Sequence, residues 1–281
     1  MNRHQSGDDQ VAAQGDGLAA AQSRVDSSCQ RQPEPGVSRI QINRPDKKNS
    51  LTPEVYREIR DAVLRASGST DVRVIVIEGQ PGAFAVGGDL KLLRDIAVLP
   101  PAERLLAYAN AYGEPLPFQA ILDCPKPVIA KIDGLCLAGG LVIASLADVA
   151  IASQRSVFGV PEGLVGLADP FCSAILPLTV GLSRARYLMM TARRINALTA
   201  EAWGIVHEVV TEEDLDTRLD ALVSDLLRVS PEAQKAYKRA ANRSVPRMNP
   251  LDVCEAAFTP NGLEGLTAFS ERRPPNWVPD R

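Results

Sequence analysis

The fold class is decided by the stretch Pro127-Val-Ile-Ala-Lys-Ile-Asp-Gly-Leu-Cys-Leu-Ala-Gly-Gly140. Its first six residues form an apolar run typical of a buried strand, and Asp133 and Gly134 end that strand. Small residues then lead into the apolar run Gly140–Leu146, which we expect to form a helix. Strands that alternate with helices predict an α/β fold with parallel pairing.

Working outward, the same alternation continues on both sides of this stretch. Thr52 is placed to cap a helix that begins at Pro53, because Thr is a favoured cap residue and Pro a favoured first residue. Further strands are expected at 36–43, 72–77 and 149–152, and further helices at 215–226, 231–243 and 263–272. We therefore predict three regions: a disordered tail at 1–22, an α/β core at 23–200 and a helical C-terminal region at 201–281.

Composition narrows the class of protein. The 281 residues are 45% hydrophobic and 23% charged with a net charge of −3, which predicts a globular protein without general attraction to nucleic acids or anionic membranes. Five scattered cysteines form no CxxC pair, so a zinc site and a disulfide framework are not expected, and a cytoplasmic location fits best. Outside the tail, His207 is the single histidine, which points away from His-dependent hydrolase chemistry.

Three glycine-rich segments follow predicted strands: Ala83–Leu90, Asp133–Leu141 and Phe158–Leu167. Glycine at such junctions allows a ligand to approach the backbone closely. A helix that begins at Gly139 points free N–H groups outward, and a second free N–H from the turn at 87–88 could converge on the same point. Two such donors form an oxyanion hole, which binds negative charge that develops on a carbonyl oxygen.

These segments, in this order, resemble the crotonase superfamily of enoyl-CoA hydratases and isomerases. The resemblance runs from about residue 23 to the C-terminus. The motifs that carry it lie at 43–51, 83–90, 126–140, 158–166, 204–210 and 264–273.

The resemblance implies a crotonase (ClpP-like) fold of repeated ββα units with a helical C-terminal trimerisation region, in trimers or dimers of trimers. It also implies binding of acyl-CoA thioesters, with Gly88 and Gly139 donating to the enolate oxygen. Asp89, Leu90 and Lys91 correspond to positions that wrap around the CoA nucleotide. Coenzyme A then enters as part of the substrate, and no metal or redox cofactor is expected.

The acid–base residues separate activities within this family. Similar hydratases carry two glutamates, and Glu162 fills the second position while Val142 stands at the first. Adding water requires two proton-handling groups, whereas a 1,3-proton shift needs one carboxylate. The sequence resembles the Δ3,Δ2-enoyl-CoA isomerases, which also keep one glutamate and carry a Pro-Phe pair like Pro170-Phe171. A hydratase that uses Asp169 or water instead, and a non-catalytic acyl-CoA-binding member, remain as alternatives.

Three further features of the sequence predict local details: Asp169, the segment 93–117 and the basic run 235–243. Asp169 either serves as a second acid or caps a helix that begins near Pro170, and the cap is favoured. The segment 93–117 matches the family least and is expected to form helices over the acyl group. Its apolar pocket would include Leu105, Leu106, Tyr108, Tyr112 and Phe118. The basic run 235–243 puts its charges on one side of a helix. One relative of the family it resembles binds RNA, but the net charge of −3 favours a solvated helix face.

Overall fold

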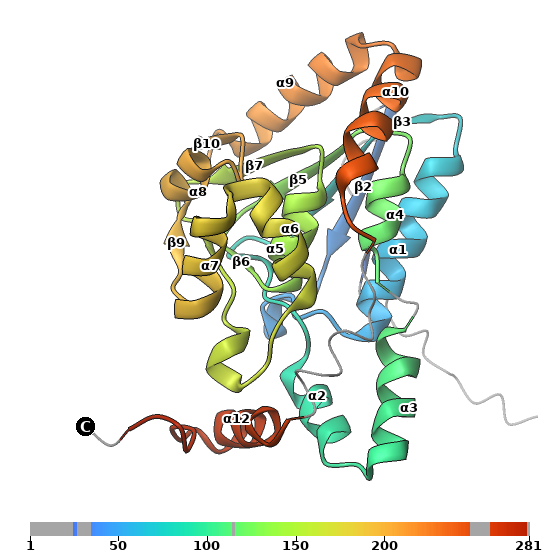
Figure 1. Ribbon diagram of the computed structural model, residues 1–281. Helices are drawn as coiled ribbons and strands as arrows, with labels where there is room; N and C mark the ends of the chain where they lie inside the picture. The colour runs from blue at the N-terminus through green and yellow to red at the C-terminus, as the bar shows by residue number, and fades with distance from the viewer. Residues whose placement is uncertain (1–24, 27–34, 114–115, 248–258, 280–281) are drawn as a thin grey trace, which may run out of the picture.

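The computed structural model describes residues 25–26, 35–113, 116–247 and 259–279 (Figure 1). The predicted tail at 1–22 lies outside these residues. Within the described residues, no helix is long and apolar enough to cross a membrane.

A six-stranded sheet forms the centre of the molecule, in the order β1-β2-β3-β5-β7-β10. All its neighbouring strands pair in parallel except β1 with β2. The predicted strands are confirmed with small shifts at their ends. Their bounds are β1 Val25–Asp26, β2 Gly36–Ile42, β3 Val72–Glu78, β5 Val128–Ile132, β7 Val149–Ser153 and β10 Glu208–Val210.

A second, four-stranded sheet of short strands has the order β4-β6-β8-β9. Its strands are β4 Ala83–Ala85, β6 Leu135–Leu137, β8 Val157–Gly159 and β9 Ile195–Asn196. Each of β3, β5 and β7 of the first sheet is followed by one short strand of the second sheet and then by helical structure. This repeat is the expected succession of ββα units.

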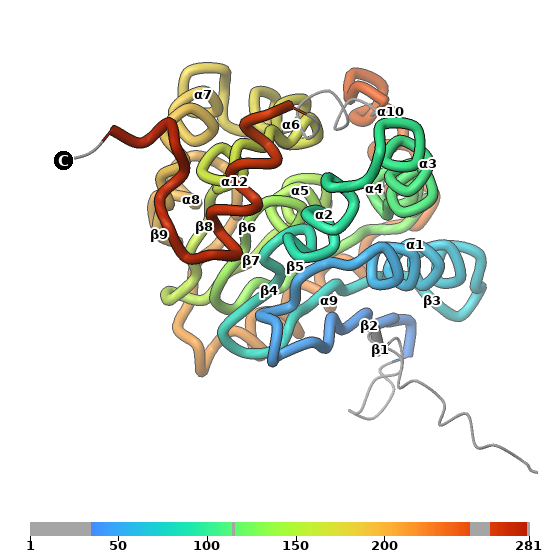
Figure 2. Tube along the Cα trace, turned by 90° about the horizontal axis from the view of Figure 1, so that it is seen from below, coloured from blue at the N-terminus to red at the C-terminus, as the bar shows by residue number. Residues whose placement is uncertain are grey.

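Helices surround the two sheets (Figures 1 and 2). The helices of the first two thirds are α1 Pro53–Gly68, α2 Leu90–Ala97, α3 Pro101–Tyr112, α4 Phe118–Asp123, α5 Gly139–Leu146 and α6 Pro170–Val180, with the short 3₁₀ helix η2 Glu162–Val165. The later helices are α7 Leu182–Thr191, α8 Ala197–Trp203, α9 Leu215–Arg228, α10 Pro231–Ala241 and α12 Pro260–Glu271. Figure 2 shows α12 lying across the molecule beside α2, far from its neighbours in sequence.

The sheet continues past residue 200, where the sequence predicts that the core ends. β10 pairs with β7, and Leu215, Leu219 and Val223 of α9 pack against the sheet residues Val74, Val76, Ile129 and Ile151. His207, just before β10, accepts a hydrogen bond at Nδ1 from the Ala150 N–H at 3.0 Å. A structural role for His207, as expected from its apolar surroundings, agrees with this bond.

The basic run of α10 differs from the expected solvated face at one position. Lys238 is buried, with its Nζ 2.6 Å from Asp148 Oδ2 and 3.1 Å from the Lys126 carbonyl oxygen. The positive charge of Lys238 is therefore used to hold the helix against the core. It is not available to contact a phosphate, which argues against the run as a nucleic-acid contact.

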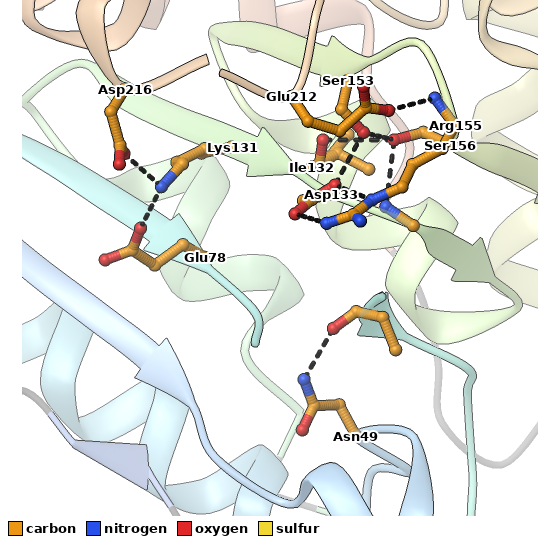
Figure 3. Close-up of polar contacts among 12 residues, drawn as sticks. Asn49, Glu78, Lys131, Ile132, Asp133, Ser153, Arg155, Ser156, Glu212 and Asp216 are labelled. Carbon is orange, nitrogen blue, oxygen red and sulfur yellow. Dashed lines mark hydrogen bonds and ion pairs between the residues drawn. The ribbon is translucent and has the colours of Figure 1, made fainter. Parts of the chain in front are cut away.

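Polar side chains brace the loops that leave the strands (Figure 3). Asn49 is fully buried, and its amide donates to the carbonyl oxygen of Ala83 at 2.7 Å and of Phe84 at 3.3 Å. On the other side, Asp133 accepts from Ser153 Oγ at 2.7 Å and from Arg155 Nε at 2.7 Å. These bonds fix β4 and the β5–β6 turn, the two segments that lead into the glycine loops at 87–88 and 139–140.

Candidate active site

A pocket of ≈ 560 Å³ opens where the two glycine loops, η2, α3 and α12 come together. It is walled mainly by apolar and aromatic side chains with a few polar groups, as small-molecule sites usually are. The lining includes Lys48, Tyr56, Gly88, Leu90, Leu93, Tyr108, Tyr112, Phe118, Ala138, Gly139, Glu162, Asp169, Phe171, Arg194, Gly265, Phe269 and Arg273. The structure thus brings together the predicted residues Gly88, Leu90, Gly139 and Glu162.

The two glycine loops touch each other. Gly87 has φ +87°, and a Cβ built on it would lie 2.3 Å from the Ala138 Cβ and 3.5 Å from the Gly139 nitrogen. Within the described residues, neither the Gly88 N–H nor the Gly139 N–H donates to a backbone carbonyl. Both groups therefore remain available to a ligand oxygen, as an oxyanion hole requires.

The peptide that carries the Gly139 N–H is held by a strained residue. Ala138 has φ 55° and ψ −128°, a conformation that L residues rarely adopt. Its N–H donates to the Gly159 carbonyl at 3.1 Å, and its carbonyl accepts from the Val142 N–H at 3.1 Å. Such strain costs on the order of 1–3 kcal/mol and clusters at functional sites. Here the strained residue directly precedes Gly139, the first residue of α5, and both residues line the pocket.

Glu162 begins η2, directly after β8 and Pro161. The residue lines the pocket, yet its Oε2 is shielded from solvent and accepts no hydrogen bond from the described residues. Burial raises the pKa of Glu162 well above its ordinary range, and the negative charge of Asp169 raises it further. A carboxyl with a raised pKa is a stronger base once ionised than an ordinary carboxylate, which suits a general acid–base group that takes and returns a proton.

Asp169 confirms the expected cap and also reaches the site. Its Oδ1 accepts from the N–H of Phe171 at 2.8 Å and of Cys172 at 3.0 Å, so it caps α6. At the same time its carboxyl interacts with that of Glu162. Burial raises the pKa of Asp169 as well, but the two N–H donors favour its ionised form. Of the pair, Glu162 is therefore the carboxyl that keeps the proton longer as the pH rises.

Val142 provides no polar group to this pocket. It lies on α5, is 1% exposed and packs within the main hydrophobic core. Helix α5 therefore contributes the Gly139 N–H to the site, while both carboxyls come from the segment between β8 and α6.

The residues expected around the CoA nucleotide fall in three different environments. Leu90 lines the pocket, and Asp89 caps α2 by accepting from the N–H of Lys91 at 3.1 Å and of Leu92 at 3.3 Å. The Lys91 side chain is exposed and pairs with Asp95 at 3.0 Å.

Three further cations at the pocket were not predicted from the sequence. Lys48, Arg194 and Arg273 all line it. Arg273 is held by Glu264 at 2.6 Å and by Glu271 at 2.7 Å. Lys48 and Arg194 form no ion pair with another residue in the described part of the chain. The clustering of basic residues after Asn43 was a signal that could have found Lys48, whereas nothing local marks Arg194.

The apolar wall agrees in part with the prediction. Tyr108, Tyr112 and Phe118 line the pocket, but Leu105 and Leu106 are 53% and 62% exposed. The prediction for these two leucines is wrong because they lie on the outer face of α3. The helix predicted at 263–272 is confirmed as α12, but its place at the pocket was not predicted: it supplies Gly265 and Phe269 to the wall. The Arg94 side chain of α2 donates to Ser270 Oγ of α12 at 2.9 Å and ties this helix down.

Comparison with known proteins gives one consistent result. A family model described as enoyl-CoA hydratase/isomerase matches residues 32–280. A probable enoyl-CoA hydratase of Mycobacterium bovis is 30% identical over 252 residues, which cover 86% of this chain and 94% of that protein.

Two further likenesses come from other mycobacteria. The (7aS)-7a-methyl-1,5-dioxo-2,3,5,6,7,7a-hexahydro-1H-indene-carboxyl-CoA hydrolase of Mycobacterium tuberculosis is 30% identical over 232 residues, covering 81% of this chain and 89% of that protein. The crystal structure of an enoyl-CoA hydratase from Mycobacterium avium subsp. paratuberculosis matches with a TM-score of 0.75 and 28% identity, covering 91% of this chain and 99% of that one. Because the family model spans nearly the whole of the described fold, the chain belongs to the enoyl-CoA hydratase/isomerase family, the crotonase superfamily of acyl-CoA enzymes.

Proposed function

We propose that this enzyme isomerises a 3-enoyl-CoA ester to the 2-enoyl ester. Glu162 as carboxylate removes a proton from C2, and the electron pair moves onto the thioester oxygen to give a dienolate. The N–H groups of Gly88 and Gly139 bind that oxygen. Glu162 then returns the proton at C4, the double bond moves to C2–C3, and the carboxylate is restored.

One observation carries this proposal. Glu162 stands in the pocket with a raised pKa, while α5, where similar hydratases carry their other glutamate, presents the buried Val142. A proton shift between C2 and C4 needs one carboxyl that can change its protonation state near neutral pH. Burial of Oε2 away from solvent also favours return of the same proton over its loss to water.

Hydration is the second candidate, and the Asp169 carboxyl favours it. Asp169 and Glu162 face the same pocket, so the site holds two carboxyls although they come from one segment. A pair that shares a proton could activate a water molecule with one member and protonate the substrate with the other. The hydratase name of the similar Mycobacterium bovis protein adds support.

The coenzyme A part of the ester would meet Lys48 and Arg194, the two pocket cations without an ion-pair partner among the described residues. Their charges suit the phosphates of CoA. Asp89, Leu90 and Lys91 remain predicted CoA contacts, and Leu90 is the one on the pocket wall. The proton shift uses protein groups only, so we expect activity without an added metal or redox cofactor.

A trimer or dimer of trimers remains our proposal for the assembly. Large apolar side chains are exposed on neighbouring helices, among them Leu178, Leu182, Met190 and Leu198. Apolar side chains exposed together suit burial against another copy. Light scattering after gel filtration tests this proposal directly. A cytoplasmic location is likewise a proposal, supported by Cys124, Cys136 and Cys172, which are buried and free.

An ultraviolet time course on two substrates tests the reaction. Isomerisation of trans-3-hexenoyl-CoA creates the absorbance of the conjugated enoyl thioester, and hydration of crotonyl-CoA abolishes it. A rise in absorbance with trans-3-hexenoyl-CoA and no change with crotonyl-CoA supports the isomerase. Loss of absorbance with crotonyl-CoA at a comparable or greater rate would establish the hydratase in its place.

A further inference from the structure

Tyr112, the last residue of α3, carries a hydroxyl group for which the proposed reaction has no use. The residue is 5% exposed and lines the pocket. Its hydroxyl is shielded from solvent and has no hydrogen-bond partner among the described residues. It lies 3.9 Å from the position that a Cβ on Gly88 would take, which places it beside the oxyanion loop.

Aromatic rings and an aliphatic chain pack around this residue, and the carboxylates of Asp89 and Glu54 are near enough to act on its pKa but form no hydrogen bond with its hydroxyl. The Tyr112 ring lies 4.9 Å from that of Tyr108 and 6.4 Å from that of Tyr56, between ring centroids. Leu93 lies 3.5 Å from the same Cβ position on Gly88. Burial raises the pKa of Tyr112 above its usual range, so the phenol remains protonated and acts as a donor.

A buried donor without an acceptor destabilises the free protein, because it has lost its hydrogen bonds to water and gained none in return. Phenylalanine would fill the same volume without this penalty. Because Tyr112 lines the pocket, its hydroxyl would gain a partner if a bound ligand brought an acceptor next to it. The orphan donor therefore marks where an oxygen of the ligand should lie.

The thioester oxygen is a poor candidate for that acceptor. It has two lone pairs, and the N–H groups of Gly88 and Gly139 are already available for them. Tyr112 instead belongs to the segment 93–117, which we expect to cover the acyl group and whose residues Leu93 and Tyr108 also line the pocket.

We propose that Tyr112 selects acyl-CoA esters whose acyl chain carries a hydroxyl or carbonyl oxygen beyond C3, which accepts a hydrogen bond from the Tyr112 hydroxyl. The proposal rests on the proposed function only in that the pocket binds an acyl-CoA ester. A site built around a donor discriminates against ligands that lack the acceptor, because the donor is then left unpaired.

Calorimetric binding of saturated esters, which the enzyme cannot isomerise or hydrate, tests this selection. Hexanoyl-CoA is compared with 4-, 5- and 6-hydroxyhexanoyl-CoA; the 3-hydroxy ester is left out because hydration would produce it. We expect at least one hydroxy ester to bind the wild-type protein about fivefold to tenfold more tightly than hexanoyl-CoA. In Tyr112→Phe this preference should disappear while hexanoyl-CoA binds unchanged or more tightly.

Tyr237→Phe, on the exposed face of α10, is the matched control and should keep the wild-type preference. The proposal is overturned if no hydroxy ester is preferred by the wild-type protein, a result that needs no variant to fold. It is also overturned if the preference for the hydroxy ester survives in Tyr112→Phe. It is overturned as well if the substitution weakens binding of hexanoyl-CoA as much as binding of the hydroxy esters, since the hydroxyl would then bind the thioester oxygen. Because this test measures binding and not turnover, its result does not depend on whether the enzyme is an isomerase.

Discussion

The carboxyl group of Glu162 interacts with that of Asp169, and Asp169 is at the same time the N-cap of α6. The helix N–H groups stabilise the aspartate as an anion, while Glu162 Oε2 receives no such donor from the described residues. The pair therefore tends to hold one negative charge and one proton over a wide pH range. Glu162 therefore accepts a proton from C2 only after it has lost its own, so its raised pKa sets the pH above which the enzyme is active.

Glu162→Gln should remove most of the turnover. The amide has the shape of the neutral acid but cannot accept the C2 proton, so we expect kcat to fall by about 10²–10⁴-fold. Binding of a saturated acyl-CoA ester should change little, because the N–H donors and the apolar wall remain. Steady-state kinetics and calorimetry check both expectations, and an unchanged kcat would remove Glu162 from the mechanism.

The same substitution should alter the pH dependence of stability. A carboxyl whose folded pKa is raised stabilises the fold fully below its unfolded pKa, and this contribution is lost as the pH rises through the folded pKa. Wild-type protein should lose up to about 1.4 kcal/mol per pH unit relative to Glu162→Gln in that window. Melting temperatures measured from about pH 5 to about pH 9 should show a difference between the two proteins that grows with pH. A difference in melting temperature that does not change with pH would mean that folding does not raise the pKa of Glu162.

Asp169→Asn should move the acidic limb of the kcat/KM profile to lower pH. The amide oxygen still caps α6, but the negative charge that raises the pKa of Glu162 is gone, so the Glu162 carboxylate forms at lower pH. Asp169→Ala is the comparison for loss of the cap, which destabilises by about 1 kcal/mol. If Asp169→Asn instead abolishes activity without moving the limb, Asp169 handles a proton itself and hydration gains support.

Gly139→Ala should damage the oxyanion hole. An added Cβ would lie 2.2 Å from the Tyr56 hydroxyl oxygen, so the ring or the loop must shift. We expect a loss of about 10²–10³-fold in kcat, the size found when one oxyanion donor is removed. Adding Tyr56→Phe removes the clashing oxygen and should restore part of that loss. Gly68→Ala, where a Cβ meets nothing within 4 Å, is the control and should leave kcat unchanged.

Much of this site could be predicted because its residues lie in local patterns. Apolar runs of four or more residues marked the strands, and small residues after them marked the loops of Gly88 and Gly139. Pro170 after Asp169 likewise marked where α6 begins. Such signals survive without knowledge of the fold because each is set by backbone conformation.

The parts of the fold and of the site that could not be predicted depend on contacts between segments that are distant in the sequence. The strands β4, β6 and β8 have three residues each, too few to show a period. Phe269 reaches the pocket from α12, and only the packed structure shows that helix beside α2. Which face of α3 is buried could not be told from its leucines, so Leu105 and Leu106 were misplaced and the orphan hydroxyl of Tyr112 was invisible.

The central claim is that one carboxyl, that of Glu162, carries the proton from C2 to C4. The most direct measurement is a single turnover of trans-3-hexenoyl-CoA that is dideuterated at C2, in ordinary water, with the product analysed by NMR. We predict that deuterium from C2 appears at C4 of the 2-enoyl product, because the shielded carboxyl returns what it removed. A product with no deuterium at C4 would contradict the account, since the proton delivered to C4 would then come from a separate donor in exchange with solvent.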